Sequence, residues 1–376
     1  MADTVKTKIT DEALAKLKSQ VGIPQGRDLP EWELEDAKLL RSQIRSYGVM
    51  IGDMNPIFTD LEYAQKTRWG TILCHPGIIN EQEHLEPQSE LLPGCRAVLS
   101  EATIDWYHPM KMGDLLLSKT AVGAIKDVKT APGGGRRVSV ELNTPVNNQS
   151  NQLVGEVRTV WHCYERGSGA EKAIFGNRVP VVYNQDDIEA LKAEYKREEP
   201  PRGADIRYWE DTEVGEELPQ IMKGPTTNIR RVGGSISRWY WGHGQGWQMF
   251  KEHPELFFTN DTGAPEPIVS ADWNHYHSER YLGVPGALEC ATERIHWNVH
   301  LLTDWMGDDG FLKRLDLHFP KVNLLGDVTR CHGRVKGKRV TAGMYIAEIE
   351  IWNENNSGDT VTTGTAEVIL PSTTQI

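Results

Sequence analysis

The chain has 376 residues, a formal net charge of −12, 39% hydrophobic residues and 25% charged residues. The acidic balance disfavours nucleic acids and anionic membrane surfaces as partners, because both would repel the protein. The length exceeds what one hydrophobic core usually serves, so the sequence predicts two domains of similar size.

Targeting and cross-linking signals are missing from the sequence. It contains no run of about 18 apolar residues, and its start, Met1-Ala2-Asp3-Thr4, lacks the charged-then-apolar layout of a signal peptide. The five cysteines are scattered without a CxxC pair, which argues against a disulfide framework or structural zinc. We therefore expect a cytoplasmic protein.

The first half predicts helices followed by strands. A short helix is expected over residues 11–17 and another over 35–47, where apolar residues recur at helical spacing. The turn-rich loop 52–60 precedes a further helical stretch over 61–68. Between residues 96 and 164 the pattern changes to the alternation of strands with short turns.

A linker separates this half from the rest of the chain. Residues 167–206 mix glycine, proline and charge around a helical stretch at 187–196, which is typical of a connecting segment. The sequence thus predicts a first domain over residues 1–166 and a second domain over residues 207–376.

The second half repeats the first. Gly113-Asp114 recurs as Gly326-Asp327 and Gly70 recurs as Gly283, both 213 residues later (326 − 113 and 283 − 70). Gly155 in the last hairpin recurs as Gly364, 209 residues later (364 − 155). Three matches in the same order indicate a duplication.

The elements of each half favour an α+β fold. Each half combines a loop, a long apolar helical region and about four strands. The stretch 295–306 is apolar round most of its surface and so belongs inside the protein. Two curled antiparallel sheets, each wrapped around a central helix and joined edge to edge, would bury both helices and remove two sheet edges.

Several motifs resemble one known family. The first half carries Gly52-Asp53-Met54-Asn55-Pro56-Ile57 and then Tyr63-Ala64, and the second carries Tyr208–Gly215, Gly283-Val284-Pro285-Gly286 and Asn323–Asp327. The first set is similar to the GDxNPxHxDxxxA loop, and Tyr208–Gly215 to the opening strand, of the MaoC-like acyl-CoA dehydratases, the (R)-specific enoyl-CoA hydratase group. The resemblance covers nearly the whole chain outside the first 35 or so residues and the linker, and implies the tandem double hot-dog fold.

The resemblance also implies a reaction. In that family the loop Asp and His activate a water that adds across the double bond of a trans-2-enoyl-CoA, and the loop Asn supports them. One group must take a proton from water while another supplies a proton to the α-carbon. A backbone N–H at the start of the central helix polarises the thioester carbonyl. The implied partner is an acyl-CoA thioester, and no redox cofactor or metal is implied.

The first-half loop departs from the family pattern. Asp53 and Asn55 match it, but Phe58 stands where the family has His. Without the imidazole this loop lacks one of the two groups that transfer protons in the family. We therefore expect the first half to be degenerate and to supply pocket walls. His75, which precedes Pro76, is expected to be structural.

The second half offers the candidate catalytic residues. Asp272-x-Asn274-x-x-His277 reproduces the family's spacing, which predicts Asp272 and His277 as the dyad, Asn274 as the residue that positions the loop and His275 as a supporting residue. A competing register pairs Pro267 with Pro56 and places Asp272 opposite Asp60. Under that register both halves lack the dyad.

Further candidates surround this loop. Glu289 and Arg294 flank the start of the central helix, either as a buried ion pair or facing substrate. Alternating glycines interrupt an aromatic cluster ahead of the loop, which favours a lining segment over a core helix. The predicted pocket wall consists of Trp239, Trp241, Trp247 and Trp273. His296, His300 and His318 lack a third ligand at zinc spacing, so we expect no metal site.

The sequence therefore predicts a hydro-lyase that adds water reversibly to a 2-enoyl-CoA with a bulky acyl group, in lipid or aromatic acid metabolism. The alternatives are a hot-dog acyl-CoA thioesterase and a non-catalytic acyl-CoA-binding subunit of a hetero-oligomeric hydratase. We expect neither nucleic acid nor membrane as a partner, and a homo-oligomer, a dimer or larger, formed through sheet or helix faces.

Overall fold

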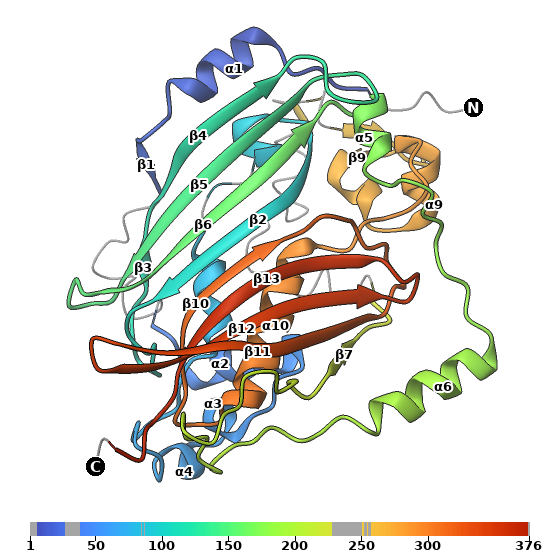
Figure 1. The fold of residues 1–376 in the computed structure, drawn as a ribbon. Helices are drawn as coiled ribbons and strands as arrows, with labels where there is room; N and C mark the ends of the chain where they lie inside the picture. The colour runs from blue at the N-terminus through green and yellow to red at the C-terminus, as the bar shows by residue number, and fades with distance from the viewer. Residues whose placement is uncertain are drawn as a thin grey trace.

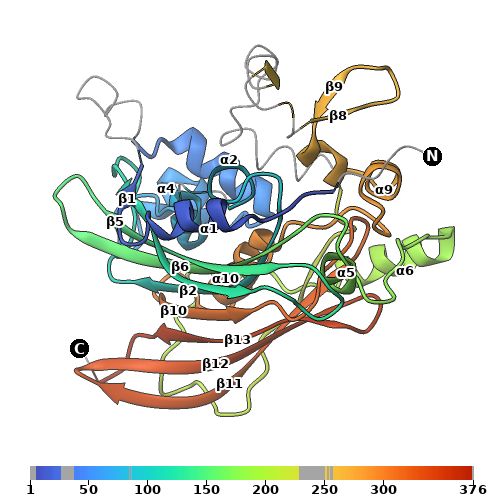
Figure 2. The same ribbon diagram turned by 90° about the horizontal axis from the view of Figure 1, so that it is seen from above.

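The computed structural model describes residues 6–26, 38–83, 85, 87–227, 250–251, 254 and 257–374. Its main feature is an 11-stranded antiparallel sheet, in which the order is β1-β4-β5-β6-β2-β10-β13-β12-β11-β7 and β3 pairs with β5. Helices cover one face of this sheet (Figures 1 and 2). The strands are β1 Pro24–Gln25, β2 Arg96–Trp106, β3 Leu117–Ser118, β4 Thr120–Val128, β5 Arg137–Asn147, β6 Leu153–Tyr164, β7 Ile221–Lys223, β10 Phe311–His318, β11 Thr329–Thr341, β12 Met344–Asn355 and β13 Thr360–Ile369.

The predicted strand regions and their edge-to-edge joining are confirmed. The two halves meet where β2 pairs with β10, and there Thr103 lies opposite Asp316, its own counterpart in the 213-residue repeat. The repeat also preserves a turn, since Asp114 Oδ2 accepts from the N–H of Lys111 at 2.8 Å and Asp327 Oδ2 accepts from that of Leu324 at 2.7 Å. The junction is therefore a local two-fold axis between duplicated halves.

Among the described residues, only those of the second half form a long central helix. Helix α10 (Ala291–Met306) is buried on nearly every side and contacts β2, β10 and β11. At the corresponding place the first half has a short 3-10 helix, η2 (Pro76–Gln82), followed by the π-helical turn η3 (Pro87–Leu91). Pro87 cannot continue a helix that comes from η2. The expectation of one central helix in each half is thus corrected, and the joined sheet stays open from β1 to β7.

Two other expected elements also differ. The helix predicted over 35–47 is observed as α2 (Arg41–Ile51), because Lys38 instead forms a bridge with Leu115. Tyr208–Gly215, predicted as an opening strand, forms turns, and the short strand β7 takes the edge position beside β11. Gly215 has φ +96°, which a regular strand does not use.

The remaining helices flank this framework. The predicted helix near the N-terminus is α1 (Asp11–Lys18), capped by the side chain of Thr10. Two short helices, α3 (Pro56–Thr59) and α4 (Leu61–Ala64), follow α2, and the linker forms α5 (Gly169–Ala173) and α6 (Gln185–Tyr195). A second small sheet, β8 (Phe257–Thr259) with β9 (Pro265–Pro267), leads into η5 (Ile268–Asp272), α9 (His275–His277) and η6 (Ser278–Leu282). Among the described helices, none has the length and apolar character needed to cross a bilayer.

One hydrophobic cluster spans the two halves. It contains Ile104 and Val157 from the first half together with Trp297, Leu315 and Ile349 from the second. Because burial of apolar side chains is the main favourable term in folding, neither half is expected to be stable without the other.

Gly364, one of the repeated glycines, lies where strands β13 and β10 approach closely, and its substitution tests whether this approach stabilises the fold. It lies opposite Leu317, and a β-carbon there would be 2.1 Å from the Asp316 carbonyl oxygen. Gly364→Ala should lower the free energy of unfolding by about 1–3 kcal/mol, because the backbone must shift. Urea unfolding measures this, with the exposed neighbour Thr363→Ala as a control expected to change stability by less than about 0.5 kcal/mol. Equal stability of the two variants would contradict the close approach.

Candidate active site

The loop between α2 and α4 holds a fully buried aspartate. Gly52 ends α2 with φ +80°, and Asp53 Oδ1 then accepts from the N–H of Asn55 at 3.0 Å. The Asn55 side chain accepts from the N–H of Ile57 at 3.2 Å and so caps α3, where Pro56 occupies the first helical position. The loop sequence thus fixes the direction of the Asp53 carboxylate.

An imidazole and a hydroxyl from distant segments meet this carboxylate. His75 Nε2 lies 3.1 Å from Asp53 Oδ2, and the hydroxyl of Thr303 on α10 donates to the same oxygen at 2.9 Å. His75 Nδ1 accepts from the N–H of Gly77 at 3.1 Å, so the imidazole proton is on Nε2 and faces Asp53. Asp53 and His75 are both 0% exposed. Asp53 is therefore paired with a histidine, although Phe58 replaces the family's loop histidine.

Burial and neighbouring groups decide which member of this pair carries a charge. Burial alone would raise the pKa of Asp53, but the hydrogen bond from His75 and the neighbouring imidazoles outweigh it and hold that pKa below its ordinary value. Burial lowers the pKa of His75, and the interaction with Asp53 only partly offsets this. The resulting pair is a carboxylate beside a neutral imidazole.

A second imidazole cluster adjoins the pair. Lys223 Nζ donates to the carbonyl of Ile51 at 3.0 Å, at the C-terminal end of α2, and lies 2.5 Å from His300 Nδ1. His300 Nε2 in turn lies 3.1 Å from Asp304 Oδ2. Ligand atoms of Asp53, His300 and Asp304 lie within 4.8 Å of one another, as a metal site would require. The ammonium of Lys223 against His300 would repel a divalent cation, so we assign no metal to this cluster.

A third set of groups extends along α10 toward its N-terminal end. The hydroxyl of Tyr47 lies 2.5 Å from His296 Nδ1, and His296 Nε2 lies 3.1 Å from Glu81 Oε1. A β-carbon on Gly77 would lie within 3.1 Å of the Tyr47 hydroxyl, His296 Nδ1 and His75 Nδ1. The three clusters thus form one buried polar region between the first-half loop and α10. Burying so many polar groups is costly, and such regions are typical of functional sites.

An apolar pocket borders this polar region. It encloses about 530 Å³, counted out to solvent. Asn55, Cys74 and Thr303 form part of its wall beside Asp53, while Trp69 and Trp106 lie among its aromatic lining. Its apolar and aromatic lining suits a small organic ligand or acyl group.

The structure does not bring the predicted dyad together. The two oxygens of Asp272 accept from Arg96 Nη1 at 2.8 Å and from Arg166 Nη2 at 3.1 Å, and all three side chains are buried. The His277 ring packs near Phe258 and Tyr281. No hydrogen bond or ion pair joins Asp272 to His277 among the described residues. Asp272 is placed as a buried counter-ion between the halves.

The supporting residues of that loop have structural contacts. Asn274 accepts from the N–H of His277 at 2.7 Å and caps α9. His275 Nδ1 accepts from the N–H of Ala287, and Nε2 donates to the carbonyl of Leu325, both at 3.1 Å. Arg294 Nε lies 3.0 Å from Glu289, which is the paired-charge alternative for these two residues.

Equivalent caps align the two loops in a register that differs from both registers predicted from the sequence. Asp60 caps α4 as Asn274 caps α9, and the following glycines, Gly70 and Gly283, both have left-handed backbone with φ +67° and +64°. Asn274 therefore corresponds to Asp60, and Asp272 falls near Phe58 rather than opposite Asp53. The tryptophans predicted for the pocket wall, Trp239, Trp241 and Trp247, lie outside the described residues. Trp273 is half-buried and does not line the pocket.

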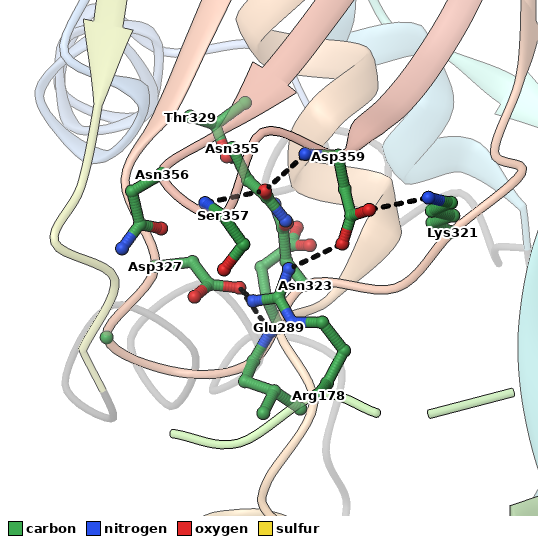
Figure 3. A network of polar contacts seen from close by, with 12 residues as sticks. Arg178, Glu289, Lys321, Asn323, Asp327, Thr329, Asn355, Asn356, Ser357 and Asp359 are labelled. Carbon is green, nitrogen blue, oxygen red and sulfur yellow. Dashed lines mark hydrogen bonds and ion pairs between the residues drawn. The ribbon is translucent and has the colours of Figure 1, made fainter. Parts of the chain in front are cut away.

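A linker arginine occupies the end of the second half (Figure 3). Arg178 binds the carboxylates of Asp327 and Asp359, and Lys321 reaches Asp359 from the other side at 2.5 Å. Asn355 donates to the buried Asn323 at 3.1 Å within the same network. This network anchors the linker to the second half.

Comparison with known proteins agrees with the architecture. Residues 30–157 match the family model described as "FAS1-like, dehydratase domain region". No curated protein sequence matches the chain. A solved MaoC-like dehydratase superposes with a TM-score of 0.63 at 14% identity, covering 95% of this chain and 100% of that chain. A putative MaoC domain protein dehydratase from Chloroflexus aurantiacus gives a TM-score of 0.54 at 10% identity, covering 89% and 92%.

The chain has the MaoC-like hot-dog fold. The resemblance drawn from its motifs is confirmed at this level, and the matched dehydratase region includes both Asp53 and His75. In this polar region, sequence reasoning missed the contacts of His75 and of the α10 residues Thr303 and His300. The sequence feature that could have pointed to His75 is its position just before Pro76-Gly77, at the start of the first-half helical segment.

The buried histidine makes an acid dependence of stability testable. The pKa of His75 is lowered from its ordinary value of 6.5, so below that pH the unfolded chain binds a proton that the folded chain does not. Its contribution to stability is thus lost as the pH falls below about 6.5. Between pH 7.5 and 5.5, His75→Asn should lose roughly 1 kcal/mol less unfolding free energy than the wild type. Urea unfolding across this range checks it, and parallel curves would contradict a buried neutral His75. The contribution of ionised Asp53 to the free energy of unfolding is lost only below pH 3.8, outside this range.

The placement of Asp272 gives a second prediction. Asp272→Asn leaves the buried guanidinium groups of Arg96 and Arg166 without their shared carboxylate. We expect a loss of about 3–5 kcal/mol in unfolding free energy, because Arg166 is left as an uncompensated buried charge while Arg96 keeps only Glu171. The matched control is Asp261→Asn, which breaks an exposed pair with Arg280 and should cost less than about 1 kcal/mol. Similar small losses in both variants would show that Asp272 is not the counter-ion described.

Proposed function

We propose that this protein is a hydro-lyase that adds water reversibly to a 2-enoyl-CoA thioester, with Asp53 as the proton acceptor and His75 as its imidazole partner. One observation carries the proposal: an ionised Asp53 lies 3.1 Å from an imidazole, behind the wall of an apolar pocket. The match of residues 30–157 to a dehydratase region supports it.

The chemistry assigns a task to each group. Water is a poor nucleophile, so Asp53 takes one of its protons as the oxygen bonds to the β-carbon, and the protonated acid then supplies a proton to the α-carbon. The neutral His75, whose Nε2 lies 3.1 Å from Asp53 Oδ2, stabilises the Asp53 carboxylate before the first step and after the second. Asn55 lines the pocket while its carbonyl oxygen caps α3, so we assign its amide N–H group to the thioester carbonyl.

Access to Asp53 passes Thr303. The Thr303 hydroxyl lies between the pocket and the carboxylate, within hydrogen-bond distance of Asp53 Oδ2 and of the His300 carbonyl. We infer that rotation of this side chain admits the reacting water, which then occupies the place of the hydroxyl. The acyl group would lie along the aromatic lining of the pocket.

The predicted Asp272–His277 dyad remains the alternative location for the same reaction. Both of its oxygens are engaged by buried guanidinium groups, those of Arg96 and Arg166, so the contacts of Asp272 are those of a counter-ion and not of a group that holds water beside an imidazole. We therefore place the reaction in the first half. The division into domains 1–166 and 207–376, the homo-oligomeric state and the cytoplasmic location stay predictions.

Activity assays on a panel of 2-enoyl-CoA thioesters test the proposal. Loss of enoyl absorbance measures hydration, and release of free CoA measures the thioesterase alternative. Asp53→Asn should lower kcat for hydration by at least about 100-fold, because the amide cannot accept the proton. Asp60→Asn, which alters a helix cap in the same loop, is the matched control and should retain most activity.

The outcomes separate the candidates. Unchanged hydration in Asp53→Asn together with its loss in His277→Ala would move the reaction to the second half. Release of CoA without loss of enoyl absorbance would make the protein a thioesterase. Binding of the thioesters without either reaction would identify an acyl-CoA-binding subunit, for which the complete burial of Asp53 and His75 is a specific argument.

A further inference from the structure

A second carboxyl group faces the pocket at the C-terminal end of α10. Gly307 ends the helix with φ +70°, and a β-carbon there would lie 3.1 Å from the Gly203 carbonyl oxygen. The N–H of Asp308 donates to the Gly203 carbonyl at 2.9 Å, and Trp69 Nε1 donates to the Asp308 carbonyl at 2.8 Å. The linker and the first-half loop thus clamp the backbone of Asp308 from two sides.

Among the described residues, only one of the two carboxylate oxygens of Asp308 accepts a hydrogen bond. The Tyr63 hydroxyl donates to Oδ2 at 2.5 Å, whereas Oδ1 is buried and has no hydrogen-bond partner among the described residues. Asp308 is 5% exposed and lines the pocket together with Trp69, Trp106 and Phe311. A buried acceptor without a donor is costly, so such an oxygen favours a partner other than the described residues.

We propose that Asp308 is a specificity-determining residue, which accepts a hydrogen bond from a hydroxyl or ammonium group at the far end of the bound acyl chain. The inference rests on the proposed function, because it takes the occupant of the pocket to be an acyl thioester. Thr303, beside Asp53, lies about 4.5 Å along the helix axis before Met306, where α10 ends, and Asp308 follows two residues later. The polar group would thus lie several carbons from the thioester.

The charges around Asp308 agree with a donor ligand. Burial raises the pKa of Asp308, and Asp309 adds to the effect, while Tyr63 opposes it. Burial and Asp308 together raise the pKa of Tyr63 to about 12, so the phenol keeps its proton and continues to donate. Arg68 pairs with Asp309 at 3.3 Å and stacks over Trp69 at 4.2 Å. A ligand donor at Oδ1 would complete the hydrogen bonding of a carboxylate that is otherwise held in an apolar wall.

Binding of non-reactive saturated thioesters tests this assignment. Calorimetry with hexanoyl-CoA, 6-hydroxyhexanoyl-CoA and 6-aminohexanoyl-CoA gives the preference for each chain end, and the matching four- and eight-carbon series gives the length. We expect the wild type to bind at least one polar-ended chain about tenfold or more tightly than its methyl-ended partner, because a buried acceptor discriminates strongly.

Substitutions then assign the preference to Asp308. In Asp308→Asn the Tyr63 hydroxyl should donate its hydrogen bond to the side-chain amide oxygen. The NH₂ group then points toward the pocket. The preference for the amino chain should fall to less than about threefold, while the hydroxyl chain, which can also accept, should lose less. Tyr63→Phe leaves Oδ1 in place, and Asp309→Asn removes the neighbouring charge outside the pocket lining, so both should keep the wild-type preference.

Each outcome decides the assignment. Equal binding of all three chain ends by the wild type, or an unchanged preference in Asp308→Asn, would overturn it while leaving the hydration proposal intact. A preference that depends on Asp308 in a protein that does not hydrate enoyl-CoA would support it and refute the proposed reaction. If no thioester binds, both proposals fail.

Discussion

The pairing of β2 with β10 is the interaction on which the rest of the structure depends. It sets Thr103 opposite Asp316, its counterpart in the duplicated sequence, and makes one sheet from two halves. Without this pairing each half would expose a sheet edge, and the long helix α10 would lack the first-half residues that cover it. With it, α10 lies against both the second-half sheet and the loop that carries Asp53.

The junction also explains why the two halves have diverged. A duplicated fold needs only one long helix to fill the space beside its sheet, and α10 provides it. The first half has a short 3-10 helix at that place, and His75, at the start of this helix, reaches Asp53. The corresponding loop in the second half carries Asp272 to Arg96 and Arg166, where it joins the halves electrostatically. One loop therefore borders the pocket, while the other stabilises the assembly.

The buried polar groups of this protein differ in what pairs with them. The buried region along α10 contains carboxylates and imidazoles that mostly satisfy one another, from Glu81 to Asp304. In the network around Arg178 the ion pairs instead fasten the linker (Figure 3). Asp308 differs from both, because it lines an apolar pocket and one of its oxygens is buried without a donor among the described residues. Such differences separate groups that hold the fold from groups available to a ligand.

The sequence by itself determined the strand regions, the duplication and the resemblance to MaoC-like proteins, because alternation, turn glycines and loop motifs are local patterns. It predicted Asp53 and Asn55 to form a degenerate site, and it predicted the dyad at Asp272 and His277 from spacing alone. Only the tertiary structure decided which groups meet, since His75, Thr303 and the Asp272 arginines come from segments far apart in the chain. Local spacing cannot encode such contacts, because they arise from the register of β2 against β10 and the packing of α10.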